Sequence, residues 1–576
     1  MENPERVTYF AATDARGKKI PFGIKAKDRA RHMYVIGKTG MGKSTLLENM
    51  AIQDLRNGEG MAFIDPHGSA VEKMLDFIPE NRVKDVVYFA PFDLEHPMAF
   101  NIMEDVGYDK RHLVTSGLMA TFKKIWEDAW SARMEYILTN TLLALLEYPD
   151  ATLLGVNRMY TDKNYRKKVV DNVKDPVVKD FWTKEFAGYT DRFTQEATPA
   201  IQNKIGQFTS NPLIRNIIGQ PKSSFDIRDL MDNRKILLIN LSKGLVGDVN
   251  MRLLGSMLTT RIFLGAMSRA NLPGHELAKA PNFYFYVDEF QNFANDTFAE
   301  ILSEARKYRL NLLIAHQYVE QMEEQVRAAV FGNVGTTITF RVGPFDAETL
   351  ETVFTPEFMK EDLVNLGFAQ IYLSLMIDGI GSRPFSAVTI PPIEAPARSF
   401  RQEVLEASRS QYGSPRAGVE ASIYGELVPA EGEAAGPVEP PKRKPMNDQM
   451  RDRPPVRREG GSQSRDRGPA REPRREERRE PAANQKSSED LKAILREKVA
   501  GAKNVAEAKV EKKQDSLKGA LADVIGKSGG QHIVRDPKPQ PKQQEAPKPQ
   551  EPKRDVGPSA FEVPEEVLRS IFKENL

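Results

Sequence analysis

The pattern of apolar and polar positions divides the first 400 residues of the chain into three stretches. Before about residue 105, and again after about residue 225, short apolar runs alternate with helical patterns and turn signals. This alternation predicts strands joined by crossover helices in a mainly parallel α/β sheet. The strands are expected at 32–36, 60–64, 86–90, 235–240, 283–287, 310–315 and 336–342.

The middle stretch, 106–224, has a different period. Its apolar side chains recur at helical spacing, and all three tryptophans of the chain lie in it. Such a period is typical of amphipathic helices. We therefore predict an all-α domain inserted into one α/β domain, whose two halves are 1–105 and 225–398.

Composition changes sharply near residue 400. Beyond it Pro, Arg, Glu and Gln dominate and aromatic residues almost vanish, so the segment cannot bury enough apolar surface to offset its conformational entropy. We predict a disordered Pro/Arg/Glu-rich tail over 399–576, with the clearest disorder signal in 411–485 and 530–560. Short helices are expected near 487–526 and 564–575, where helical composition or spacing returns.

Two questions about this tail stay open. Its mixed Arg and Glu clusters are typical of a solvated linker, and the alternative is weak binding of DNA or a partner by 442–479, where Lys and Arg outnumber acids. The apolar side chains of 564–575 fit either a transient helix at a chain end or a peptide that docks in a partner's groove.

The charge of the chain is nearly balanced, since 82 Lys and Arg face 80 Asp and Glu and leave a formal net charge of +2. Any nucleic-acid contact must therefore come from a local patch. There is no cysteine, which excludes disulfides, thiolate zinc sites and a cysteine nucleophile. The N-terminus lacks the apolar core of a signal peptide, and no apolar run reaches the length of a membrane span. We expect a cytoplasmic protein with no transmembrane segment of its own.

The stretch 33–50, MYVIGKTGMGKSTLLENM, places an apolar strand, a glycine-rich loop and a helix in direct succession. The loop matches G-x-x-x-x-G-K-[ST] at every position, a pattern whose backbone N–H groups and helix N-terminus bind nucleotide phosphates. Lys43 is expected to reach the β- and γ-phosphates, and the Ser44 hydroxyl to bind Mg²⁺. The predicted ATP-binding residues are Gly37, Lys38, Thr39, Gly40, Met41, Gly42, Lys43, Ser44 and Thr45.

An acidic pair, Asp288 and Glu289, follows the apolar run 283–287. Buried charges are costly unless something compensates them, and in a P-loop fold we expect the strand that carries them next to the P-loop strand. Asp288 would then bind Mg²⁺ through a water, and Glu289 would be the base that polarises the attacking water. The alternative is an ordinary pair of acids at a helix start, which the P-loop upstream disfavours.

Three further polar positions extend this hypothesis. Asp65 ends the apolar run 60–64 and either orders water near the metal or caps the following turn. His67 is expected to be a turn or packing residue. Gln317, just beyond the run 310–315, is predicted to sense the γ-phosphate through hydrogen bonds, and the alternative is an ordinary polar strand end.

An arginine from a neighbouring subunit can stabilise the charge that develops on a transferring phosphoryl group. Arg306, in the stretch SEARKYRLN, is the candidate for this catalytic role, and Arg309, Arg341 and Arg383 are its rivals. The alternative for Arg306 is a solvated helix end.

With these residues the chain resembles the hexameric DNA-pumping ATPases of the HerA/FtsK superfamily. Within that superfamily it is most similar to the TraD/TraG-type coupling proteins of conjugation and type IV secretion. The resemblance covers about 22–395. It rests on the motifs GKTGMGKST, FIDPHG, YVDEFQNF, EARKYRLNLLIAHQ and NVGTTITFRVGPFDAETL.

The resemblance implies a RecA-like P-loop NTPase core with ATP and Mg²⁺ as cofactors. It implies a ring of six subunits that moves DNA through a central channel, with a relaxase or secretion-channel protein as a further partner. The implied catalytic residues are Lys43, Glu289, Gln317 and Arg306, and the implied metal-binding residues are Ser44 and Asp288.

The predicted function is thus an ATP-hydrolysing DNA translocase. The alternatives are a type IV secretion or pilus-assembly ATPase with a protein cargo, and a nucleotide-controlled scaffold that recruits partners through the tail. Pilus-assembly relatives usually carry a larger domain ahead of the P-loop, whereas about 36 residues precede it here. Coupling proteins commonly carry N-terminal membrane helices, and none is predicted here, so membrane recruitment would need a partner.

Overall fold

The structure is a computed structural model that describes residues 3–14, 17–104 and 106–427. Its centre is a parallel sheet in the order β9-β3-β8-β7-β4-β6-β5. These are the seven strands that the apolar runs predicted, so the mainly parallel α/β fold is confirmed. Their bounds are Met33–Ile36 (β3), Gly60–Asp65 (β4), Val86–Phe89 (β5), Ile236–Asn240 (β6), Phe283–Val287 (β7), Leu310–His316 (β8) and Thr336–Thr339 (β9).

The strand order corrects one expectation. The strand that carries the acidic pair, β7, does not lie next to the P-loop strand β3, because β8 pairs with both of them and separates them. All seven residues of β8 are buried, which suits a central strand covered on both faces. Spatial order depends on the crossover connections, and the order of the strands along the chain does not reveal it.

Four strands that the sequence analysis did not predict extend the sheet beyond β9 in the order β10-β13-β1-β2. Each of their pairings, including that of β10 with β9, is antiparallel. These strands are partly exposed, so they lack the continuous apolar runs that marked the parallel core. Their bounds are Val7–Thr13 (β1), Pro21–Lys25 (β2), Gln370–Ser374 (β10) and Phe385–Thr389 (β13), and a small separate pair is formed by Met376–Ile377 (β11) and Ile380–Gly381 (β12).

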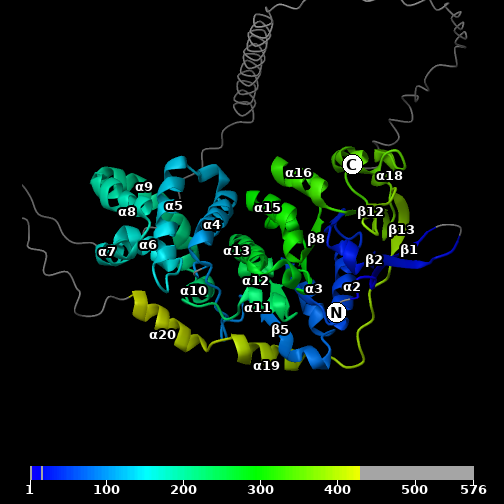
Figure 1. Cartoon of the computed structure of the whole chain (residues 1–576), viewed down its shortest axis with the longest axis horizontal. Helices are drawn as coiled ribbons and strands as arrows, with labels where there is room; N and C mark the ends of the chain where they lie inside the picture. The colour runs from blue at the N-terminus through cyan, green and yellow to red at the C-terminus, as the bar shows by residue number, and fades with distance from the viewer. Residues whose placement is uncertain (1–2, 15–16, 105, 428–576) are drawn as a thin grey trace, which may run out of the picture. The chain divides into compact units, whose positions relative to one another are not determined.

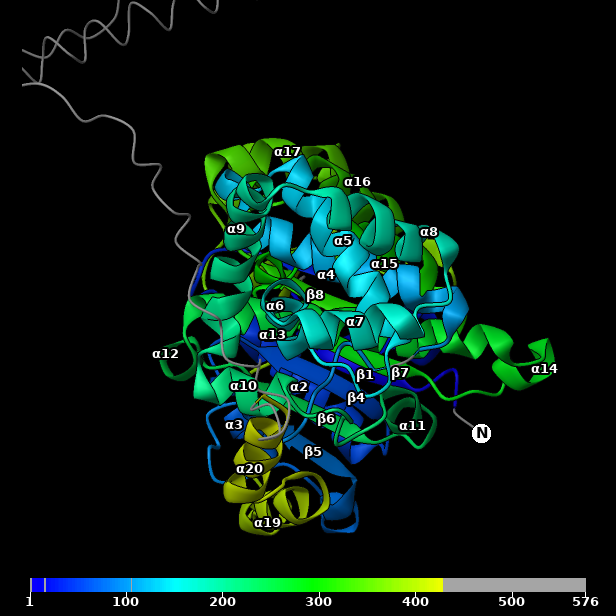
Figure 2. The ribbon, with the colours of Figure 1, turned by 90° about the vertical axis from the view of Figure 1, so that its left-hand side faces the viewer.

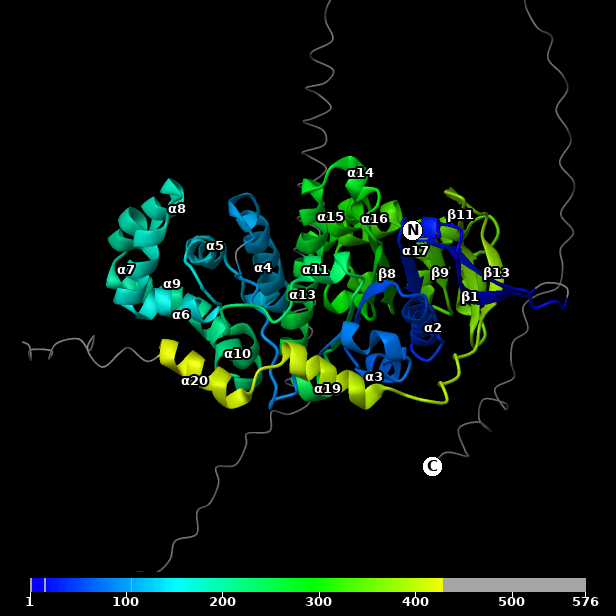
Figure 3. The ribbon, with the colours of Figure 1, turned by 60° about the horizontal axis from the view of Figure 1, so that its bottom comes forward.

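Helices cover both faces of the parallel strands. Alternate residues of β3 enter two different cores, since Met33 and Val35 belong to one and Tyr34 and Ile36 to the other. Figures 1 and 3 show α2 on one side of β8 and α13 and α15 on the other. The bounds of the covering helices are Lys43–Arg56 (α2), Ser69–Leu75 (α3), Asp248–Met267 (α13), Asp296–Glu304 (α15), Glu324–Asn333 (α16) and Pro344–Phe354 (α17).

Between Phe89 and Ile236 the described residues form helices and loops but no strand. The core on the α13 face of the sheet continues into this helical stretch. Figure 2 shows α4, α5, α6 and α7 of the stretch in front of the strands of the sheet. The contact is close, because a Cβ at Gly117 of α4 would lie 2.6 Å from the Thr260 Cγ2 of α13. The main helices are Arg111–Ile125 (α4), Ala132–Glu147 (α5), Leu154–Thr161 (α6), Lys163–Asn172 (α7), Pro176–Asp180 (α8), Asp191–Thr209 (α9) and Pro212–Ile218 (α10).

Two helices, Arg401–Tyr412 (α19) and Arg416–Leu427 (α20), occupy the start of the segment where composition predicted disorder (Figure 3). The backbone N–H of Tyr88 on the edge strand β5 donates to the Ser408 hydroxyl of α19 at 2.9 Å. Ile423 of α20 is buried in a small cluster with Leu154 and Val419. A few well-placed contacts order these helices, and composition does not reveal such contacts. The rest of the predicted tail, with its two short helices, lies outside the described residues.

Candidate active site

The glycine-rich loop connects the end of β3 to the start of α2, as the sequence predicted. Two of its glycines are required by the backbone. Gly42 has φ 116°, in the left-handed region, and a Cβ on Gly37 would lie 2.5 Å from the Cβ of Phe340. Side chains at these positions would therefore strain or displace the loop.

The residues that follow β9 hold this loop in place. The Phe340 N–H donates to the carbonyl of Ile36 at 2.8 Å, and the Lys38 N–H donates to the carbonyl of Arg341 at 2.8 Å. On the other side of the loop, the Gly37 N–H donates to the carbonyl of His316 at 3.3 Å. Sequence reasoning missed Phe340, which lies inside the run 336–342 that was predicted as a strand, whereas the observed strand β9 ends at Thr339.

Lys43 is directed back into the loop. Its side chain is buried, and its Nζ donates to the Gly37 carbonyl at 2.6 Å and to the Lys38 carbonyl at 3.3 Å. Burial lowers the pKa of Lys43, and the charges of Glu289 and Asp288 act in the opposite direction. A cation enclosed by loop backbone at a helix N-terminus is a suitable environment for a phosphate.

Ser44 and Asp288 meet although 244 positions separate them in the sequence. The Ser44 hydroxyl donates to Asp288 Oδ2 at 2.9 Å. Burial and the neighbouring charge of Glu289 raise the pKa of Asp288 to about 6, against the lowering effect of the Ser44 hydrogen bond. A hydroxyl and a carboxylate are the hard oxygen ligands that Mg²⁺ prefers, so these residues fit the predicted metal.

Glu289 is held by two glutamines. The Nε2 groups of Gln317 and Gln291 donate to its Oε1 and Oε2 respectively. Its backbone is in the left-handed region, with φ 47° and ψ 47°, which is uncommon for a residue other than glycine. The structure thus brings Glu289 and Gln317 together, and it adds Gln291, which sequence reasoning missed although it lies two residues after the acidic pair.

Asp65 caps a helix start. Its carboxylate accepts hydrogen bonds from the backbone N–H groups of His67 at 2.8 Å and Ala70 at 2.7 Å. This is the capping alternative of the sequence analysis. Its charge is still close enough to contribute to the raised pKa of Asp288. His67 itself is exposed in the turn.

The predicted catalytic arginine and the P-loop lie at opposite ends of the parallel strands. Arg306 is exposed in the short helix Ala305–Tyr308, just before the start of β8, whereas the P-loop contacts the end of β8. A strand of this length spans about 20 Å. Arg306 is therefore remote from the chain's own P-loop.

The rival arginines differ in their surroundings. Arg309 donates to the Ala278 carbonyl at 2.6 Å. Arg383 is 92% exposed and lies 3.9 Å from Glu357. Arg341 is exposed next to the P-loop, which its carbonyl contacts.

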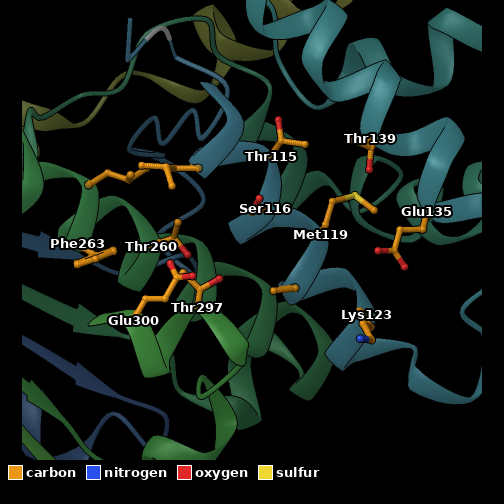
Figure 4. A pocket seen from close by; sticks show the side chains of 13 residues that line it. Thr115, Ser116, Met119, Lys123, Glu135, Thr139, Thr260, Phe263, Thr297 and Glu300 are labelled. Atoms are coloured by element: carbon orange, nitrogen blue, oxygen red, sulfur yellow. The ribbon is translucent and has the colours of Figure 1, made fainter. Parts of the chain in front are cut away.

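A cleft of about 310 Å³ lies elsewhere, between α4 and α5 on one side and α13 and α15 on the other (Figure 4). Its charged lining residues are Lys123, Glu135 and Glu300. With two acids and one base, this cleft has no excess of positive charge for a polyanion.

Replacing Asp288 by Asn is expected to stabilise the nucleotide-free protein at pH 8. The pKa of the folded carboxyl is about 6 against an ordinary 3.8, so the folded state retains this proton to higher pH than the unfolded state. Ionisation of Asp288 therefore costs stability as pH rises from about 4 to about 6, and the full cost, about 3 kcal/mol, persists above pH 6. Urea unfolding at pH 8 and at pH 4.5 measures it, and the difference between D288N and the natural protein should shrink at the lower pH.

The exposed Asp109→Asn is the matched control for this measurement, because it removes a carboxylate at the surface and should leave the urea midpoint unchanged. A D288N protein that is less stable than the natural chain at pH 8 would contradict the prediction.

Comparison with known proteins gives one family-model match. The model described as the type IV secretion-system coupling protein DNA-binding domain matches residues 17–355. Curated protein sequences give no match. None of the helices in the part of the chain that the structure describes has the length and apolar character of a membrane span.

The solved structures that match the chain include two forms of the conjugative coupling protein TrwB. The unbound form is 15% identical, over 65% of this chain and 88% of that chain, with a TM-score of 0.48. The complex with ADP and Mg²⁺ is 14% identical, over 69% and 91%, with a TM-score of 0.47. VirB4 of Thermoanaerobacter pseudethanolicus is 12% identical, over 70% and 99%, with a TM-score of 0.43.

Proposed function

The chain belongs to the family of type IV secretion-system coupling proteins, as the match over residues 17–355 shows, and on this premise we propose that it is an ATP-hydrolysing DNA translocase that works as a ring of six subunits. The coupling-protein resemblance found in the sequence is confirmed by the same match. The observation that carries the enzymatic part of the proposal is the Glu289 carboxylate, held by two glutamine amides one residue from the Ser44–Asp288 pair.

The proposed mechanism assigns binding to the P-loop and proton transfer to Glu289. Lys43 and the backbone N–H groups of 37–45 would bind the phosphates, and Ser44 and Asp288 would hold Mg²⁺. When bound, Mg²⁺ would neutralise charge on the β- and γ-phosphates. Glu289 would accept the proton of the attacking water, and the amide of Gln317 would keep its carboxylate in position.

We assign the DNA and subunit contacts on the family premise and on the position of Arg306. The family model is one of a DNA-binding domain. Arg306 is exposed at the edge of the sheet remote from its own P-loop, which suits an arginine that acts on the nucleotide of a neighbouring subunit. A relaxase or secretion-channel protein would be a further partner, and a partner protein would recruit the ring from the cytoplasm to the membrane.

A titration of ATP turnover with DNA at several salt concentrations tests the proposal. We expect DNA to stimulate turnover, and the logarithm of its apparent affinity to fall linearly with the logarithm of salt concentration, because each phosphate contact releases a counterion. Lys43→Ala should retain DNA binding and lose turnover. If DNA neither binds to the protein nor changes its rate of ATP turnover at low salt, the translocase proposal is wrong.

A further inference from the structure

The acidic pair and the glutamine lie on one side of the P-loop strand. Asp288 and Glu289 follow β7 and Gln317 follows β8, so all three lie on the β8 side of β3. On the other side of β3 the order continues with β9, β10 and β13. A nucleotide whose γ-phosphate faces the acids must extend its nucleoside end away from them, because the P-loop holds the phosphate chain between its two ends.

The loops on this other side are level with the P-loop. Since β9 is parallel to β3 and β10 is antiparallel to β9, the start of β10 lies at the edge where β3 ends. The end of β13 lies there too, because Val388 pairs with Gln370. The segment 365–369, just before β10, is therefore next to the path of the nucleoside.

This segment is fixed to the P-loop by the backbone of Ala369. The Ala369 N–H donates to the Met41 carbonyl at 3.3 Å, and the Ala369 carbonyl accepts from the Thr389 N–H at 2.9 Å. Ala369 has φ 60°, in the left-handed region that alanine rarely adopts. Such strain persists only where surrounding contacts impose it, and here the contacts are with the P-loop and β13.

The next loop along the sheet is also fixed to the P-loop helix. The side chain of Asn49, which is fully buried on α2, donates to the Pro391 carbonyl at 2.9 Å and accepts from the Ile393 N–H at 2.9 Å. Both loops that flank the expected nucleoside path are thus hydrogen-bonded to the nucleotide site, one through Met41 of the P-loop and the other through Asn49 of α2.

Phe368 is exposed in the segment 365–369, next to the P-loop. Its side chain is 76% exposed, although the residue after it is tied to the P-loop. A single exposed aromatic residue is ordinary on a protein surface. Phe368 differs because it directly precedes Ala369, whose strained backbone is hydrogen-bonded to the phosphate-binding loop, so its exposed ring lies next to that loop.

We propose that Phe368 is the residue on which the base of the bound nucleotide stacks. The proposal rests on the proposed nucleotide-binding function and adds to it the site of the nucleoside. Stacking uses the π-face that every base has, so Phe368 supplies affinity for nucleosides without distinguishing adenine from guanine. The phosphates remain the task of the P-loop.

Calorimetric binding of three ligands with Mg²⁺ tests the proposal: ATP, GTP and inorganic tripolyphosphate. Phe368→Ala is expected to weaken ATP and GTP alike, by about tenfold, which is the size of one base–aromatic stack. Its affinity for tripolyphosphate should be unchanged. Phe368→Tyr keeps an aromatic face and should bind all three ligands as the natural protein does.

Phe345→Ala is the matched control, because Phe345 is 71% exposed at the same edge but is followed by Asp346, which accepts from the Val319 N–H beyond β8. It should leave all three affinities unchanged. Equal losses for ATP and tripolyphosphate in Phe368→Ala, or no loss at all, would overturn the proposal, and so would a base-dependent loss in Phe345→Ala alone. If the natural protein binds neither ATP nor tripolyphosphate, the proposed function fails instead.

Discussion

Replacing Glu289 by Gln should reduce ATP turnover by about 10³-fold and leave Mg²⁺–ATP affinity nearly unchanged. The carboxylate is the proposed proton acceptor, and an amide of the same shape cannot accept that proton. The P-loop contacts that bind phosphates do not involve Glu289, since Lys43 donates to loop carbonyls and Ser44 to Asp288. Turnover measured by phosphate release and affinity measured by calorimetry separate the two effects.

A matched control for this experiment is Gln291→Ala. Gln291 donates to the same carboxylate, but it positions the base and accepts no proton itself. We expect a smaller fall in turnover in Q291A than in E289Q. If E289Q keeps the turnover of the natural protein, Glu289 is not the base. If E289Q loses much of its affinity for ATP, Glu289 contributes to nucleotide binding instead.

The sequence predicted those parts of the site that depend on contiguous residues. The P-loop and the acidic pair each form a short motif at the end of an apolar run, so their local structure follows from neighbours in the chain. The contact between Ser44 and Asp288 followed from the P-loop hypothesis and did not depend on the order of the strands. The prediction that β7 lies next to β3 was wrong, since β8 separates them. Both residues nevertheless lie at the ends of parallel strands on the same side of the sheet, because Ser44 follows β3 and Asp288 follows β7.

The sequence could not supply contacts that depend on distant segments. Phe340 packs against Gly37 across more than 300 positions, and nothing in its own neighbourhood marks it as a support of the P-loop. Helices α19 and α20 were missed for the same reason. Their order comes from partners such as Tyr88 and Leu154, which lie far away in the sequence.

A buried charge network below the P-loop helix was also invisible in the sequence. Arg29 and Asp54 are both 0% exposed, and the guanidinium of Arg29 donates to the two carboxylate oxygens at 2.7 and 2.8 Å. The Tyr286 hydroxyl lies 2.8 Å from the Arg29 guanidinium and 2.6 Å from the Asp54 carboxylate. Because Asp54 lies on α2 and Tyr286 on β7, this network joins the helix that follows the P-loop to the strand that carries the acidic pair.

Replacing Arg29 by Met should destabilise the protein by about 3 to 5 kcal/mol, because it leaves the buried Asp54 carboxylate without the cation that balances its charge, although the Tyr286 hydroxyl still donates to it. The double variant R29M/D54N should lose less than R29M alone, since it removes the unpaired charge along with the ion pair. Urea midpoints of the natural chain and of R29M, D54N and R29M/D54N measure both effects. Arg383→Met is the control, because Arg383 is 92% exposed and its loss should shift the midpoint very little. If R29M is as stable as the natural protein, or if the double variant is less stable than R29M, the stability of this network does not come from keeping the Asp54 charge paired.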